Sequence, residues 1–244
     1  MVVPLYNCST ALPRLLDEIL KLQVPGGMEL ILVNDGSGDD TAEVGARLVR
    51  DRREAITFID LARNFGEHNA VMTGLRHASG SYIVNLDDDL QNPPSEALKL
   101  LAHAQLHGMD VVYSRFKTKH HSLARNLGSW FANRVADFLL DKPRGLYLSS
   151  FRCMSAFAVQ QIIRYGGPFP YIDGLLLQVT KRIGSVDVEH APRLSGRSGY
   201  NLRRLLRLWL NIVINFSVMK SGYSGAFRGM VNCRKPSPVK VSSG

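Results

Sequence analysis

The first half of the chain alternates short apolar runs with amphipathic stretches, and this alternation constrains the fold more than any other feature. The apolar runs, which we expect to be buried strands, are residues 2–5, 30–33, 56–59, 82–86 and 111–113. The helical patterns between them are residues 12–22, 41–50, 69–78 and 93–107. Strand and helix alternation at this spacing predicts an α/β fold, a Rossmann-like and mostly parallel sheet flanked by helices.

The second half is less regular. We expect helices at residues 122–140, 172–183 and 201–218, and strands at residues 150–154 and 186–189. The chain has 244 residues, which suits one large domain. Its N-terminus lacks a secretory signal. The first residues have the pattern of a strand interior, so we expect a few residues to precede Met1. No apolar run reaches the roughly 20 residues that cross a bilayer.

Positive charge is concentrated near the C-terminus. The formal net charge is +9, and residues 190–244 hold ten Lys and Arg but no Asp or Glu. Such a block suggests an anionic partner: phosphate, nucleic acid or an anionic membrane. The basic residues alternate with Leu, Ile and Trp, and the chain has no recognisable nucleic-acid-reading motif, which disfavours a nucleic-acid binder. Three cysteines without a CxxC pair exclude a disulfide framework and suggest no zinc site.

Three consecutive carboxylates follow the apolar run at residues 82–86. Alternation of side chains in an extended chain would place Asp87, Asp89 and Gln91 on one side and Asp88 on the other. Oxygen donors in this arrangement suit Mg²⁺ or Mn²⁺, which would neutralise a departing diphosphate. We also expect Asn92 to cap a helix whose first residue is Pro93. The alternative is an acidic strand-to-helix turn without a ligand.

Two loops at the same edge of the predicted sheet suggest a nucleotide pocket. Asp35 ends one strand and could accept the imide N–H of a uracil, and Tyr6 ends another and could stack on its ring. Taken alone, the stretch from Asn34 to Thr41 is equally consistent with a turn that starts a helix.

These pieces together resemble family 2 of the inverting glycosyltransferases, which have a GT-A fold. The matching stretches are residues 2–7, 33–41, 61–66, 80–94, 149–152 and 193–200, within a match that covers residues 1–218. The sequence is most similar to the polyprenyl-phosphate branch, on Arg63-Asn64-Phe65-Gly66, Asp89-Leu90-Gln91 and Ser150-Phe151-Arg152. That branch includes dolichol-phosphate mannose synthase, bactoprenol glucosyltransferase and undecaprenyl-phosphate formamido-arabinose transferase.

The resemblance implies an enzyme that moves a sugar from a nucleotide sugar, a UDP-sugar by preference, to a polyprenyl phosphate in cell-envelope glycan synthesis. It implies donor binding by Pro4, Tyr6, Asp35, Asp87, Arg193, Arg197 and Ser198, and a metal, Mg²⁺ or Mn²⁺, on Asp87, Asp89 and Gln91. Asp89 and Arg152 would be catalytic. Arg152 would hold the acceptor phosphate, with Arg115 and Arg125 as further acceptor candidates that could equally be surface charges. We interpret Asp173 as a helix N-cap, with contact to sugar or acceptor as the alternative.

The C-terminal pattern indicates a membrane contact. Apolar residues from Leu202 to Phe216 share one helical face and basic or amide residues share another, which suits a helix lying in the bilayer interface; packing on the core is the alternative. We therefore expect a catalytic domain at residues 1–200, an interfacial helix at 201–219 and a loose basic tail at 220–244. This would be a peripheral protein at the cytoplasmic face, without a transmembrane helix, and it could form a homo-oligomer.

Three other functions fit parts of the sequence. The same donor chemistry could serve a soluble polysaccharide or protein acceptor, and dependence on lipid separates the two. A nucleic-acid binder would show a salt-dependent shift of DNA. A truncated, inactive relative would lack metal-dependent hydrolysis of the donor.

Overall fold

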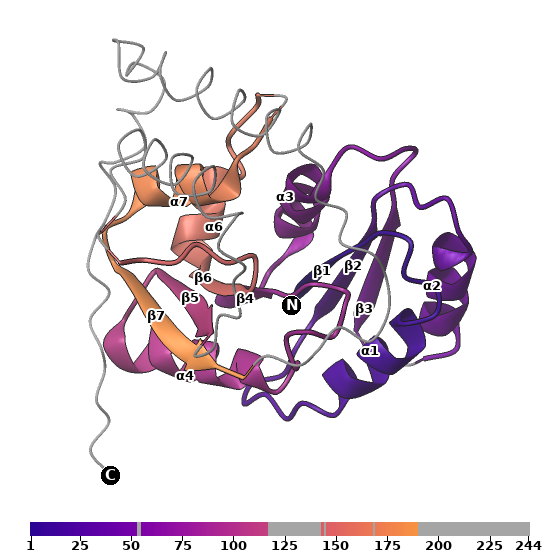
Figure 1. Ribbon diagram of the computed structural model, residues 1–244, viewed down its shortest axis with the longest axis horizontal. Coiled ribbons are helices and arrows are strands. Elements are labelled where there is room, and N and C mark those ends of the chain that lie inside the picture. The colour runs from indigo at the N-terminus through magenta and orange to yellow at the C-terminus, as the bar shows by residue number, and fades with distance from the viewer. Residues whose placement is uncertain (53–54, 117–142, 144, 168, 190–244) are drawn as a thin grey trace, which may run out of the picture.

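The computed structural model describes residues 1–52, 55–116, 143, 145–167 and 169–189. Its strands are β1 (Val2–Leu5), β2 (Leu30–Asn34), β3 (Ile56–Asp60), β4 (Tyr82–Asn85), β5 (Val111–Phe116), β6 (Arg152–Ser155) and β7 (Ile183–Val188). Its helices are α1 (Leu12–Leu20), α2 (Thr41–Arg50), α3 (Glu67–His77), α4 (Glu96–His107), α6 (Ala156–Ile162) and α7 (Ile172–Val179). Figure 1 shows their arrangement.

The strands form one seven-stranded sheet in the order β3-β2-β1-β4-β6-β5-β7. All neighbours pair in parallel except β6, which runs antiparallel to both β4 and β5. The predicted α/β fold with a mostly parallel sheet flanked by helices is therefore confirmed. The carboxyl ends of β1, β2 and β4 come together at one edge, where ligands of open parallel sheets bind.

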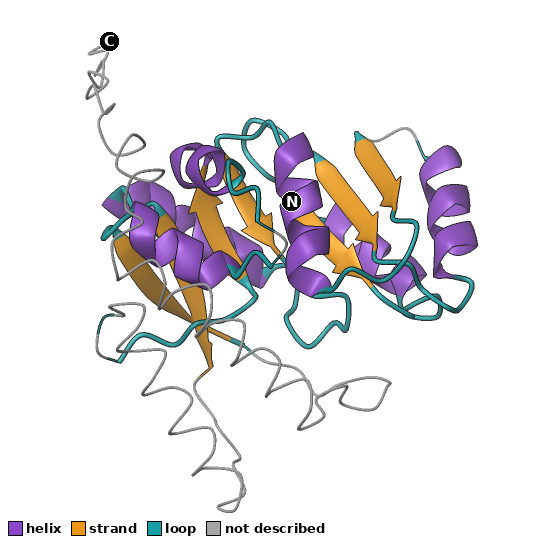
Figure 2. Ribbon diagram, turned by 90° about the horizontal axis from the view of Figure 1, so that it is seen from above, coloured by secondary structure: helices purple, strands orange, loops and turns teal. Residues whose placement is uncertain are grey.

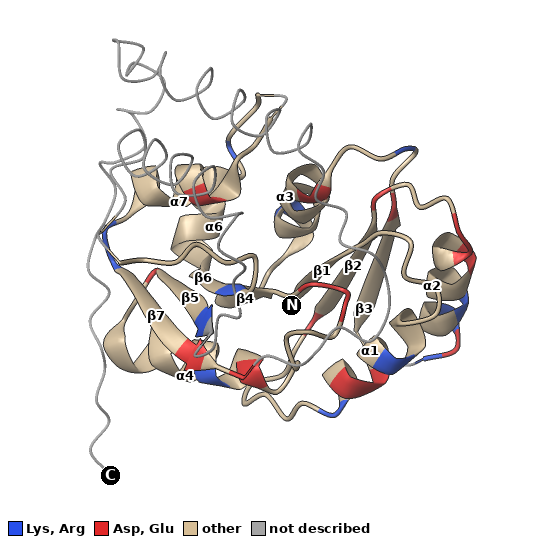
Figure 3. Ribbon diagram, in the orientation of Figure 1, with Lys and Arg blue, Asp and Glu red and all other residues tan. Residues whose placement is uncertain are grey.

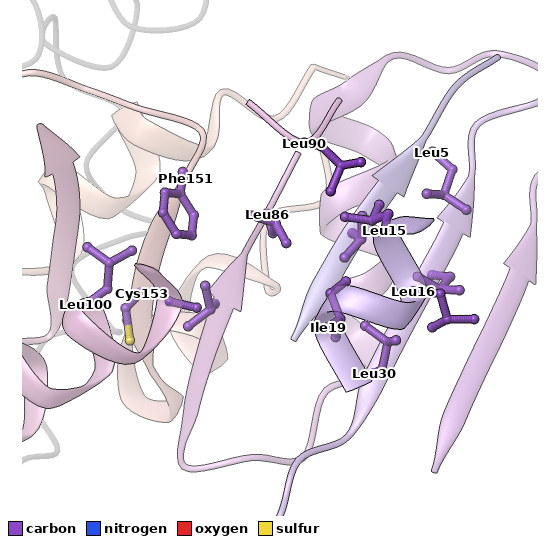
Figure 4. Close-up of a cluster of buried hydrophobic side chains, with 14 of the residues drawn as sticks. Leu5, Leu15, Leu16, Ile19, Leu30, Leu86, Leu90, Leu100, Phe151 and Cys153 are labelled. Atoms are coloured by element: carbon purple, nitrogen blue, oxygen red, sulfur yellow. The ribbon is translucent and has the colours of Figure 1, made fainter. Parts of the chain in front are cut away.

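Helices cover both faces of the sheet, as Figure 2 shows from above. The central strands are buried on both sides, so alternate residues feed two hydrophobic clusters. In β2, Leu30 and Leu32 belong to a cluster that also contains side chains of α1 and α4, whereas Ile31 and Val33 belong to one that contains side chains of α3, α6 and α7. Figure 4 shows the first cluster, with Leu15, Leu16 and Ile19 of α1 facing Leu5 and Leu30.

Two helix boundaries differ from the sequence prediction by more than two residues. The fourth helix begins at Glu96 rather than Pro93, because Pro93 and Pro94 form a turn whose carbonyls accept the N–H groups of Glu96 and Ala97. Asn92 is consequently not an N-cap. The helix predicted at residues 172–183 ends at Val179, since Thr180 is extended and its hydroxyl donates to Asp110, 2.6 Å away.

The chain then enters β7, which starts at Ile183 instead of residue 186. None of the helices in the described ranges has the length and apolar character that crossing a bilayer requires. The helices predicted at residues 122–140 and 201–218, and the tail after residue 219, lie outside the described residues.

Candidate active site

Asp35, the first residue after β2, ties the loop that follows β3 to this edge of the sheet. Its side chain is buried, with 3% of the residue exposed. Oδ1 accepts the backbone N–H of Phe65 at 2.7 Å and Oδ2 accepts that of Gly66 at 2.9 Å. Burial raises the pKa of Asp35, and these two hydrogen bonds oppose the rise. Each oxygen keeps a second lone pair, so the carboxylate can still accept a ligand N–H.

Gly36 makes this close approach of the two loops possible. Its φ is +57°, and a Cβ there would lie 2.2 Å from the carbonyl carbon of Arg63. Only glycine fits both the left-handed backbone and the contact.

The turn after β1 is joined to the turn after β2 in the same way. Asn7 has a φ of +52°, donates its N–H to Ser37 Oγ at 3.0 Å and accepts the N–H of Gly38 on Oδ1 at 2.8 Å. Tyr6 precedes Asn7 in this turn and is 45% exposed, so its ring is accessible for stacking. Pro4 lies buried in β1, below the turn.

The acidic loop after β4 lies beside β1, where Figure 3 shows it in red. Asp88 points toward β1 and accepts the N–H of Tyr6 on Oδ2 at 2.9 Å. Asp87 points the other way, where its Oδ2 accepts from Ser150 Oγ at 2.7 Å and from Asn92 Nδ2 at 3.1 Å. The two side chains thus diverge as the sequence predicted. The chain does not stay extended to Gln91, however, because it turns at Leu90, whose φ is +58°.

Burial is the main cause of the raised pKa of Asp87, which lies near 6. The Ser150 hydrogen bond lowers it, and the charges of Asp89 and Asp88 raise it further. Carboxylates that disfavour one another's ionisation at a strand end are electrostatically suited to a cation.

The donor set fits a divalent ion of modest protein coordination. In the parts of the chain that the structure describes, no three His, Cys, Asp or Glu side chains converge to hold a metal. Gln91 lies two residues after Asp89, and its backbone N–H donates to Asp89 Oδ1 at 3.1 Å. One or two carboxylates, an amide oxygen, water and ligand phosphate are the usual shell of Mg²⁺.

Arg152 of β6 lies in a buried polar cluster. Only 1% of the residue is exposed, and its Nη1 donates to Asp173 Oδ1 of α7. The same oxygen accepts the hydroxyl of Tyr113 in β5 at 2.9 Å. The interpretation of Asp173 as an N-cap is therefore wrong: Tyr171 is the N-cap residue of α7, without a side-chain cap, and Asp173 neutralises a buried guanidinium. Arg152 Nε is buried without a partner among the described residues.

The start of α3 adds two ionisable groups that the sequence analysis missed. Glu67 is solvent-exposed, but partial loss of hydration beside neighbouring atoms, followed by the charge of Asp87, raises its pKa to about 7. Burial lowers the pKa of His68 to about 4. The His68 ring meets Tyr171 edge-on, with centroids 5.4 Å apart. The helix was expected to begin at residue 69, which left both residues in a loop.

The remaining predicted residues divide into two groups. Arg115 is exposed and pairs through Nε with Asp187, its direct partner in the register of β5 and β7. Arg125, Arg193, Arg197 and Ser198 lie outside the described residues. The structure thus brings Tyr6, Asp35, Asp87 and Asp89 to one edge and places Arg152 in the layer beneath α3 and α7.

Comparison with known proteins points to one family. The family described as "Glycosyl transferase family 2" matches residues 1–162. An undecaprenyl-phosphate 4-deoxy-4-formamido-L-arabinose transferase of Photorhabdus laumondii is 33% identical over 215 residues, which are 87% of this chain and 66% of the relative. Its namesake in Yersinia pestis is 33% identical over 216 residues, 87% of this chain and 65% of the relative. The chain thus spans slightly less than two thirds of these curated relatives.

Solved structures share the fold at low sequence identity. Glucosyl-3-phosphoglycerate synthase of Mycobacterium tuberculosis, in complex with Mn²⁺, UDP and phosphoglyceric acid, aligns with a TM-score of 0.64 at 19% identity. The alignment covers 87% of this chain and 74% of that one. Residues 1–349 of TarS from S. aureus align with a TM-score of 0.56 at 16% identity, over 88% and 65% of the two chains. The architecture of the described residues is that of the GT-A fold.

Proposed function

The chain belongs to glycosyl transferase family 2, and on that basis we propose that it moves a sugar from a nucleotide sugar to a polyprenyl phosphate at a membrane surface. The observation that carries the proposal is the placement of Asp35 and the Asp87–Asp89 loop at the carboxyl ends of β2 and β4, the two strands that flank β1. This edge offers an acceptor for a base N–H next to carboxylates for a metal-bound diphosphate. The names of the relatives support undecaprenyl phosphate as acceptor, and the synthase bound to UDP supports a UDP-sugar.

The donor would lie along this edge. Asp35 would accept the imide N–H of the base, with Tyr6 stacked on the ring and Pro4 beneath. Asp87 would contact the ribose or diphosphate, while Asp89 and Gln91 would hold Mg²⁺ or Mn²⁺. When bound, the metal would neutralise charge on the diphosphate.

The acceptor needs little activation. A phosphate monoester is largely a dianion at pH 7 and already nucleophilic. Its oxygen would form a bond to the anomeric carbon while the bond to the diphosphate breaks, and the electron pair would leave with the diphosphate. Attack from the opposite face inverts the configuration. The protein then contributes chiefly position and charge.

Arg152 is proposed to bind the acceptor phosphate. Its Nε–H is a buried donor without a partner among the described residues, whereas Nη1 donates to Asp173. Because the guanidinium is covered, the side chains above it would have to shift for a phosphate to reach it. Arg115 and Arg125 are weaker candidates, and Arg193, Arg197 and Ser198 are proposed to close over the diphosphate. The enzyme would work at the cytoplasmic face, with residues 1–200 as its catalytic domain and 201–219 as its interfacial helix.

The test is transfer of radiolabelled sugar from a panel of UDP-sugars to undecaprenyl phosphate in detergent, with Mn²⁺ or Mg²⁺ and with EDTA. Asp89→Asn should lower the rate by about 100-fold or more, in line with the loss of one group that stabilises transition-state charge. Asp17→Asn is the matched control, because Asp17 is exposed on α1 and its ion pair with Arg52 lies at the surface. UDP release without labelled lipid would point to a soluble acceptor instead, and equal activity in EDTA would contradict the metal.

A further inference from the structure

The chain between α6 and α7 presents an aromatic ring to solvent. Phe169 is 52% exposed, and Figure 1 shows this segment standing out beyond the two helices that it joins. A single exposed aromatic side chain is common on soluble proteins and needs no explanation by itself. Three further observations distinguish this one.

The backbone on either side of Phe169 is held in place. Tyr165 donates its N–H to the carbonyl of Ile162 at 3.0 Å and its hydroxyl to the carbonyl of Phe169 at 3.4 Å. Arg76 of α3 donates from Nη2 to the carbonyl of Tyr165 at 3.2 Å. The Tyr165 ring lies over Gly167, where a Cβ would come within 2.2 Å of the phenol oxygen. An ordered support therefore presents the Phe169 ring, which lowers the entropy lost when it binds.

Two arginines accompany the ring, one hydrogen-bonded to the carbonyl of Tyr165 and one next to Tyr165 in the chain. Arg76 and Arg164 are both exposed. The sequence from residue 142 to residue 172 contains no Asp or Glu. Aromatic rings flanked by arginines favour the headgroup level of anionic membranes, where the ring enters the acyl boundary and guanidinium groups meet phosphates.

The segment also leads directly to the candidate site. Two residues after Phe169, Tyr171 meets the ring of His68 at the start of α3. Asp173, two residues further, holds Arg152. Five residues of extended chain span at most about 18 Å, so a bilayer that receives Phe169 would lie near the candidate acceptor group.

We propose that Phe169, supported by Tyr165 and flanked by Arg76 and Arg164, is a membrane-docking surface whose partner is an anionic phospholipid bilayer. Phe169 enters the interface, and the two arginines bind lipid phosphates. The inference deepens the proposed function, because a lipid acceptor is the reason for the site to face a bilayer. It assigns a bilayer contact to the catalytic domain itself, in addition to the one expected from residues 201–219.

The experiment measures co-sedimentation of the full chain with vesicles of phosphatidylcholine and phosphatidylglycerol. Phe169→Ser should lower the partition coefficient about fivefold, since an interfacial aromatic side chain contributes on the order of one kcal/mol. Phe169→Leu should restore most of it. Leu106→Ser is the matched control, because Leu106 is 80% exposed on α4, away from this segment. Arg164→Gln should weaken binding and reduce its dependence on salt.

Unchanged binding of Phe169→Ser overturns the proposal, as does an equal loss in Leu106→Ser or a wild-type chain that does not bind these vesicles. A second assay separates this result from the proposed function. Transfer to a short-chain isoprenyl phosphate dissolved in detergent should be the same in Phe169→Ser and the wild type. If no chain transfers sugar, the proposed function fails while the vesicle result still decides the docking surface.

Discussion

At the scale of single residues, the ion pair between Arg152 and Asp173 is the most deeply buried one among the described residues. Asp173→Asn removes the charge that balances a buried guanidinium, which typically costs about 3–5 kcal/mol. Tyr113→Phe deletes only a neutral donor to the same oxygen and should cost about 1 kcal/mol. Urea unfolding measures both. Asp17→Asn, which breaks an exposed pair with Arg52, should cost less than about 1 kcal/mol. Equal losses for Asp173→Asn and Asp17→Asn would contradict the role of burial.

Glu67 and His68 should give the chain two opposing pH dependences. The pKa of His68 falls from 6.5 to about 4 on folding, so its contribution to stability is lost as the pH drops through that window. The pKa of Glu67 rises from 4.5 to about 7, so the stability it contributes below pH 4.5 is lost as the pH rises toward 7. Asp87 acts in the same sense as Glu67 between pH 3.8 and about 6.

Single substitutions should separate these two dependences. Subtracting the stability of His68→Phe from that of the wild type should leave a difference that grows with pH between about 4 and 6.5. The same difference for Glu67→Gln should shrink with pH between 4.5 and about 7. Urea midpoints across pH 4 to 7 provide the measurement. If the two difference curves had slopes of the same sign, the pKa values of Glu67 and His68 would not be shifted in opposite directions, which would contradict the prediction.

The sequence suggests Asp35, Asp87 and Asp89 as candidate site residues because each follows an apolar strand, and strand ends meet at one edge of a parallel sheet. It does not identify the partner of Arg152, which lies 21 residues away on a different element. That contact depends on how α7 packs over the sheet, and residue types alone do not determine it. Asp173 near a helix start is equally consistent with a cap.

At the scale of elements, hydrogen bonds within the protein connect the loops that form the candidate site. Gly36→Ala should separate the loop after β2 from the loop after β3, since a Cβ would overlap the backbone of Arg63. We expect a loss of several kcal/mol, beyond the 1–2 kcal/mol or so that a left-handed backbone costs an ordinary residue, and a matching loss of UDP binding by calorimetry.

Gly27→Ala is the control for the backbone term, because Gly27 has a φ of +87° but nothing within 4 Å of its would-be Cβ. It should lose only the smaller amount and bind UDP normally. A Gly36→Ala chain that binds UDP as the wild type does would show that the junction of the two loops is dispensable.

The sequence predicts a helix or strand boundary correctly where the hydrophobic periodicity changes. It misplaces the boundary where a local hydrogen bond or turn determines the end of the element. The bounds of β1 and α2 were predicted correctly, since apolar runs and helical spacing are unambiguous there. The starts of α4 and β7 were misplaced, because a proline turn and the Thr180–Asp110 hydrogen bond set them. Neither cause appears in a hydrophobic pattern.

At the scale of the whole molecule, the sequence gives the fold class but not the order of the strands. Apolar runs show that strands exist and are buried on both faces, yet they do not specify which strand lies beside which. The insertion of the antiparallel β6 between β4 and β5 places Arg152 directly opposite both Asn85 and Tyr113. This row of polar side chains is therefore a consequence of topology.

The same topology predicts that donor and metal stabilise the chain together. UDP would contact the loops after β1 and β2, and the metal would contact the loop after β4. Binding of both would therefore link three consecutive strands of the sheet at their carboxyl ends. A ligand at 100 times its Kd adds about 2.7 kcal/mol, or roughly 5–10 °C in Tm for a chain of this size. UDP with Mn²⁺ should produce that shift in a thermal melt, whereas UDP with EDTA should produce much less. Asp89→Asn should remove the metal-dependent part and keep the remainder, because on the proposed assignment Asp35 and Tyr6 would still bind the base. A shift that survives both EDTA and Asp89→Asn would place the metal elsewhere and contradict its assignment to the acidic loop.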